Sequence, residues 1–182
     1  MKRIKQVVFA MVAIVALAIA GVSIAAAFQP NDYTVSRTRR IDASPAEVAP
    51  QLTDLREWNA WSPWMEYERT ARIEYSPGEP VGVGAWYTWH GDETGAGRME
   101  IVEASDAEVR YALHFDEPFE DDAVVVMQMA AAGDGTDVTW RMDGHNNFIG
   151  KVFGLFVDMD AMVGADFERG LENLDERLNA AD

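Results

Sequence analysis

The side chains able to do chemistry in this chain are few, and none falls in a pattern that identifies a reaction. The three histidines, His90, His114 and His145, lie far apart in the sequence, and none has a partner at metal-ligand spacing. Cysteine is absent, which excludes disulfides and thiolate metal sites. No serine has a nucleophile-elbow context, and Gly133–Thr136 lacks the lysine of a phosphate loop. We therefore predict no metal or cofactor, and the sequence identifies no catalytic residue.

Three pairs of acidic residues, Asp121–Asp122, Asp158–Asp160 and Asp166–Glu168, are spaced as acid/base dyads could be. The chain is strongly acidic, however. All 31 acidic residues follow Phe28, and 12 of the 15 basic residues do, so the part after Phe28 carries a formal charge of −19. Such pairs are expected to be solvated surface. The charge also excludes nucleic-acid binding, and it disfavours attachment to anionic lipids through a basic patch.

Three tryptophans, Trp58, Trp61 and Trp64, follow one another at three-residue steps and make up half of the six in the chain. They come after a marked helix start at Ser44–Glu47, in which serine can cap, proline fits the first helical position and glutamate completes a capping box. The helix is expected to end at Ser62-Pro63. The tryptophan corner therefore either plugs the core or forms the wall of an apolar pocket.

The N-terminus carries the basic residues Lys2, Arg3 and Lys5, followed by an uncharged apolar run over residues 7–28. A run of this length predicts a membrane-spanning helix, and the positive-inside rule places the globular part outside the cytoplasm. The alternative is a signal peptide cleaved near Ala27, which would give a secreted or periplasmic protein. We expect residues 1–28 to be the anchor or signal segment, 29–33 a linker and 34–180 one globular domain.

From residue 69 onward the hydrophobic period changes to two, with turn residues every 8–12 positions, which is typical of a meandering antiparallel sheet. After a first strand near Thr34–Ile41, the expected strands are Arg69–Tyr75, Ala85–His90, Gly97–Glu103, Glu108–Phe115, Val124–Ala131 and Thr136–Met142.

The C-terminal part returns to a helical period from Phe153 to Leu178. Four glycines, Gly150, Gly154, Gly164 and Gly170, predict close packing on the sheet or a break near residue 158. The apolar stretch Phe148–Val157 is interpreted as the buried start of this helix. The alternative is a lid at the mouth of a pocket.

The order of elements and four motifs resemble the START/Bet v 1-like (SRPBCC) superfamily, in particular its bacterial polyketide cyclase/dehydrase-like branch. The motifs are Ile41–Val48, Trp58–Trp64, Gly135–Trp140 and Met162–Leu171, and the resemblance covers Tyr33 to Leu178. It implies an α+β helix-grip fold, in which a curved antiparallel sheet of about seven strands wraps around the long C-terminal helix. It also implies an apolar cavity between sheet and helix. Because this superfamily spans carriers, receptors and enzymes, the fold does not fix the function.

Strand parity selects the residues able to line such a cavity, because alternate side chains of a strand share one face. An apolar lining with few polar groups is typical of small-molecule sites, although the same side chains could simply fill a core. The predicted lining residues are Trp61, Trp64, Tyr87, Trp89, Met99, Tyr111, Phe115, Trp140, Phe156, Met159 and Val163.

The sequence therefore favours a membrane-tethered protein that binds a hydrophobic small molecule, a lipid or an aromatic metabolite, without a cofactor. One alternative is an enzyme of the cyclase or dehydratase type that uses the same cavity. It ranks lower, since the inner set offers no clear acid/base pair. The other alternative is an interaction module whose apolar mouth grips a partner protein.

Overall fold

The computed structural model describes residues 2–180, which form two compact units. One unit joins residues 2–32 to residues 146–158, and it holds an N-terminal helix and a short helical segment. The other holds residues 33–145 and 159–180, which form a sheet and the helices packed on it.

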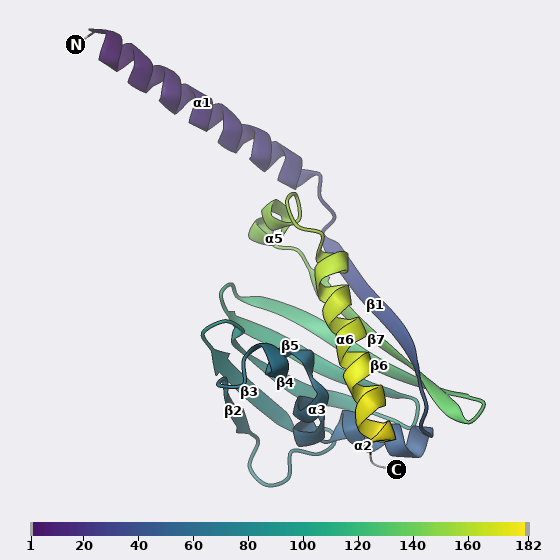
Figure 1. The fold of residues 1–182 in the computed structure, drawn as a ribbon. Helices are drawn as coiled ribbons and strands as arrows, with labels where there is room; N and C mark the ends of the chain where they lie inside the picture. The colour runs from purple at the N-terminus through teal and green to yellow at the C-terminus, as the bar shows by residue number, and fades with distance from the viewer. Residues whose placement is uncertain (1, 181–182) are drawn as a thin grey trace. The chain divides into compact units, whose positions relative to one another are not determined.

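Seven strands form one antiparallel sheet in the order β1-β7-β6-β5-β4-β3-β2, a meander closed by the first strand beside the last (Figure 1). All seven predicted strands are present, and their ends differ from the predicted ones by a few residues. The strands are β1 (Asp32–Ile41), β2 (Arg72–Tyr75), β3 (Trp86–Gly91), β4 (Gly95–Ala104), β5 (Glu108–Glu117), β6 (Asp121–Ala132) and β7 (Gly135–His145).

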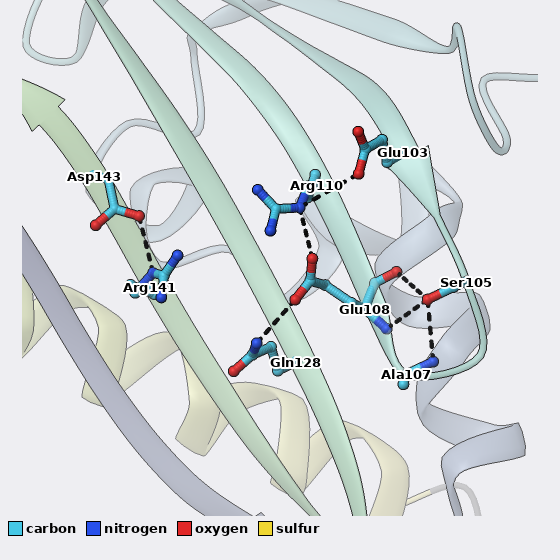
Figure 2. A network of polar contacts seen from close by, with 8 residues as sticks. All are labelled: Glu103, Ser105, Ala107, Glu108, Arg110, Gln128, Arg141 and Asp143. Atoms are coloured by element: carbon cyan, nitrogen blue, oxygen red, sulfur yellow. Dashed lines mark hydrogen bonds and ion pairs between the residues drawn. The ribbon is translucent and has the colours of Figure 1, made fainter.

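The two faces of the sheet differ as the alternation predicts. On β7, Val138, Trp140 and Met142 point inward and are buried. The outer face carries paired charges, and Figure 2 shows one such network on β4, β5 and β6. There the carboxylate of Glu108 accepts hydrogen bonds from Arg110 Nε at 2.6 Å and from Gln128 Nε2 at 2.8 Å. The contact between Glu108 of β5 and Gln128 of β6 joins neighbouring strands, and cross-strand pairs of this kind help to fix the register.

Three short helices connect β1 to β2: α2 (Pro45–Thr53), α3 (Leu55–Trp61) and α4 (Pro63–Tyr67). The predicted start is confirmed, because α2 begins at Pro45 and the Glu47 carboxylate accepts the Ser44 backbone N–H at 2.8 Å. The chain does not run as a single helix to the tryptophan corner, because it breaks at Asp54 and again at Ser62. Asp54 is extended and caps α3 by accepting the Arg56 N–H at 2.8 Å.

The long C-terminal helix α6 (Met159–Asn179) lies across the inner face of the sheet (Figure 1). Its buried side carries Phe167, Leu171 and Leu174. Gly170 allows close contact, since a Cβ there would lie 2.7 Å from the Trp140 ring and 3.0 Å from Pro63 Cδ. The prediction that helix glycines mark close packing is therefore confirmed at this position.

Polar contacts along both edges of α6 orient it. On one side, Arg37 of β1 lies 3.0 Å from the Asp160 carboxylate and 2.8 Å from that of Glu168. On the other side, the Tyr67 hydroxyl donates to Asp166 Oδ1 at 2.6 Å. Each exposed contact of this kind contributes little, about 0–1 kcal/mol, so their combined effect is on the orientation of the helix.

In the other unit, the N-terminal helix α1 (Lys2–Ala27) packs against the short helix α5 (Phe148–Phe153). Of the helices described within residues 2–180, α1 is the one long and apolar enough to cross a membrane, over Ile4–Ala27. Such a helix is a candidate membrane span, and a signal sequence would have the same length and apolar composition.

The interpretation of Phe148–Val157 as the buried start of the long helix was wrong. The stretch forms its own short helix, and α6 begins only at Met159, as the alternative of a break near residue 158 predicted. Its aromatic side chains are exposed, with Phe156 at 75%.

Glu68 follows α4 and ties it to the turn between β3 and β4. Its buried carboxylate accepts the backbone N–H groups of Asp92, Glu93 and Thr94 at 2.8, 3.0 and 2.9 Å. It also accepts the Thr94 hydroxyl at 2.8 Å. These bonds, led by the Thr94 N–H, lower the pKa of Glu68 to about 2, although burial opposes them.

A carboxylate whose pKa falls on folding stabilises the fold above its unfolded pKa of about 4.3. That contribution is lost as the pH falls through the folded pKa of about 2. We therefore expect Glu68→Gln to lower the thermal midpoint at pH 7 and to flatten the loss of stability in acid. Circular dichroism melts measure both. Glu79→Gln, at an exposed carboxylate before β3, should change neither; equal effects of the two variants would contradict this role.

Candidate functional site

The candidate site is a strip of half-buried apolar side chains on the inner face of β3 and β5, formed by Trp89, Leu113 and Phe115. The two aromatic residues flank Gly97 of β4 in register, and their rings meet edge-on with centroids 5.7 Å apart. Gly97 is required here, because a Cβ would lie 2.5 Å from the Trp89 ring. We call these three residues the inner strip.

Beside the inner strip the sheet is covered. Tyr87 and Met99 lie in the same cross-strand row as Leu113 and are buried, and the Tyr87 and Trp89 ring centroids are 5.9 Å apart. From α6, Val163 is half-buried and packs against this core, and Met159 is half-buried at the start of the helix. The structure thus brings Tyr87, Trp89, Met99 and Phe115 onto one region of the inner face.

The other predicted lining residues belong to an aromatic plug between the sheet and α6. Trp140 stacks on Phe167, with ring centroids 4.4 Å apart and planes 8° from parallel. Trp58, Trp61 and Trp64 meet the Trp140 ring edge-on at 5.0, 5.6 and 5.6 Å. Trp61 and Trp140 are almost fully buried, whereas Trp64 is half-buried. The tryptophan corner is therefore chiefly core packing.

Most polar groups of the predicted lining already have structural partners. The Tyr111 hydroxyl donates to the Leu52 carbonyl at 2.7 Å, and the Trp89 indole N–H donates to the Thr94 carbonyl at 3.2 Å. Burial raises the pKa of Tyr87, so its phenol stays neutral. The Trp140 indole N–H is buried and has no hydrogen-bond partner within residues 2–180.

Sequence reasoning missed two polar residues on the inner face, Tyr33 and Asp121. Asp121 is half-buried and pairs in register with Phe115, and burial is the main cause of its raised pKa. Tyr33 lies over Gly144, where a Cβ would be 2.3 Å from its ring, and burial followed by Asp121 raises its pKa to about 12. Extending the alternation by one residue before the predicted start of β1, and by three residues before that of β6, would have placed both inward.

The remaining chemical groups lie elsewhere. His114 faces outward, and its Nδ1 lies 2.7 Å from Asp122, a hydrogen bond that raises the pKa of the histidine. Phe156 lies in the unit that contains α1, not in the sheet unit. Within the described part of the chain, no group of three or more histidine or acidic side chains could hold a metal ion.

A hollow with a volume of about 750 Å³ lies among α2, α3, α4 and α6. Trp61 is the one predicted lining residue that borders it. Most of its other lining residues have polar or charged side chains, and Arg177 there is already bonded to Gln51 Oε1 at 3.0 Å and to Glu57. Paired polar side chains suit an apolar ligand less well than the inner strip does.

Comparison with known proteins agrees with this architecture. Residues 32–179 match the family model described as polyketide cyclase / dehydrase and lipid transport. No curated protein matches the chain significantly.

Among solved structures, protein MLL2253 of Mesorhizobium loti is 18% identical with a TM-score of 0.59, covering 82% of this chain and 99% of its own. The protein TTHA0849 of Thermus thermophilus is 20% identical with a TM-score of 0.57, covering 82% and 99%. The Aha1 dimer of Colwellia psychrerythraea is 15% identical with a TM-score of 0.57, covering 80% and 96%. At these identities the likeness establishes the shared fold.

The different burial of two tryptophans predicts different outcomes for their removal. Trp140→Ala should lower the free energy of unfolding by roughly 3–5 kcal/mol, because it opens a cavity in the plug. Trp89→Ala should cost clearly less, since its side chain is only half-buried. Urea titrations of the two variants measure the difference. Equal losses would show that Trp89 is as much a part of the core as Trp140.

Proposed function

Because the chain belongs to the polyketide cyclase / dehydrase and lipid transport family, we propose that it binds a hydrophobic small molecule, a lipid or an aromatic metabolite, on the inner strip. The observation that carries this proposal is the incomplete cover of Trp89, Leu113 and Phe115. These large apolar side chains lie on the face that elsewhere forms the core. A ligand that covers about 100 Å² of such surface contributes roughly 2.5 kcal/mol before the costs of association.

We further propose that α1 tethers the protein to the membrane and that the sheet unit lies outside the cytoplasm. The length of Ile4–Ala27 supports the span, since 24 residues extend about 36 Å as a helix and the hydrocarbon core is about 30 Å thick.

The test of ligand binding is native mass spectrometry of the full chain purified in detergent. We expect the wild type to retain a lipophile and Phe115→Arg to lose it, because a charge on the inner strip opposes apolar contact. Val124→Arg is the matched control, since Val124 lies on the outer face of β6 and is 42% exposed. Lipid held only around α1 would be the same in all three proteins. Retention of the lipophile by Phe115→Arg would contradict the proposed site.

A second candidate function, an enzyme of the dehydratase type, is favoured by one observation. Asp121 is a half-buried carboxyl beside Phe115 in register, and its raised pKa suits a group that moves a proton. Tyr33, whose raised pKa keeps it protonated, lies close enough for Asp121 to affect that pKa. Dehydration would remove a proton and a hydroxyl group from the substrate as water.

The two candidate functions differ in the effect of Asp121→Asn. If the protein is a dehydratase, the variant should accumulate a bound molecule heavier by one water than anything bound to the wild type. If it is a binding protein, both should carry the same mass. Native mass spectrometry of the two full-length proteins, expressed in the same host, separates these outcomes. Identical bound masses would rule out the dehydratase as proposed.

A further inference from the structure

We propose that Phe148–Val157 lies in the interface of a lipid bilayer, beside the end of α1. The proposal rests on the membrane tether proposed above and goes beyond it, because it adds a second, interfacial contact with lipid. The segment exposes large apolar side chains, with Phe148 at 58%, Ile149 at 50% and Phe156 at 75%. Exposed apolar clusters of this kind mark interaction surfaces.

The contacts of α5 indicate what covers it. Within their shared unit, α5 packs against α1, and the connection after α1 is bonded to the start of the segment. The Asn146 N–H donates to the Asn31 carbonyl at 2.6 Å, and its side-chain amide donates to the Pro30 carbonyl at 3.3 Å. These bonds hold the start of the segment beside residues 30 and 31, which follow Ala27, the last residue of the candidate span, by three and four positions.

The depth of the span in the bilayer therefore determines the depth of the segment Phe148–Val157. If Ile4–Ala27 crosses the hydrocarbon core, its C-terminal end lies at the boundary between acyl chains and headgroups. Phe28, which is 86% exposed, lies at the same boundary. Short apolar elements next to a span settle at this depth, with their apolar side roughly 5–10 Å inside the boundary.

The charges of the segment fit an uncharged lipid surface. Lys151 is its one charged residue, and the ammonium group is bonded to the Asn31 side chain at the polar end of the connection. A long lysine side chain can keep its charge in the headgroup region while its stem lies along apolar surface. Contact would be driven by apolar burial, because the acidic chain repels anionic lipids.

The absence of native cysteine makes the test direct, since each single-cysteine variant carries one nitroxide label. The full chain is reconstituted in phosphatidylcholine vesicles with labels at Ile149→Cys or Phe156→Cys. Oxygen, which partitions into lipid, and a water-soluble nickel chelate report the depth of each label. Val83→Cys, at a 63% exposed position before β3, is the aqueous control, and Leu17→Cys, within α1, is the bilayer control.

We expect the oxygen-to-nickel accessibility ratio at both labels of the segment, Ile149→Cys and Phe156→Cys, to be several-fold above that at Val83→Cys. A ratio equal to that control would overturn the proposal, as would labels shielded from both reagents, which would mean burial against protein. The Leu17→Cys label tests the tether separately. If this label is exposed to water, the span itself fails. If it is in lipid while the two segment labels are in water, only the interfacial contact fails.

Discussion

The sheet unit depends on one contact, the stack of Trp140 on Phe167 beneath the bare backbone of Gly170. The rings lie 4.4 Å apart, and any side chain at position 170 would collide with Trp140 and Pro63. The contact therefore fixes the height of α6 above β7. It also fixes the position of α4, because Trp64 packs edge-on against both rings of the stack. The inner strip is the part of the inner face that this aromatic plug does not cover.

Much of the fold could be predicted because periodicity reports burial directly. Alternation along β5 and β7 placed Tyr111 and Trp140 inward, and both are almost fully buried. The glycines of the C-terminal helix predicted close packing, and Gly170 confirms it. The position of the break between α2 and α3 was not predicted, since Asp54 at this break pairs with the distant Val81. A contact between residues so far apart leaves no trace in local periodicity.

The candidate site was harder to predict than the fold. Parity tells which face a side chain occupies, but it does not tell whether another side chain already fills the space in front of it. Trp140 and Phe115 both point inward, yet Trp140 is stacked in the plug and Phe115 is only half-buried. Phe156 was assigned to the same lining through helical period, although α6 starts only at Met159. Asp121 was taken for surface because the chain is strongly acidic, whereas its register with Phe115 places it inward.

An open strip and an enclosed cavity bind in different ways. A ligand on Trp89, Leu113 and Phe115 buries one side of itself and leaves the other in contact with whatever lies opposite. Such a ligand gains less binding free energy per atom than a ligand enclosed on all sides. We therefore expect moderate affinity and fast release. The polar groups near the strip add little binding energy, because the Trp89 N–H is already bonded and Tyr33 is a neutral phenol. Selectivity would then depend on the shape of the aromatic surface and on the one half-buried carboxyl, Asp121. A binding role therefore requires only the strip, whereas catalysis would additionally require Asp121 to reach the ligand.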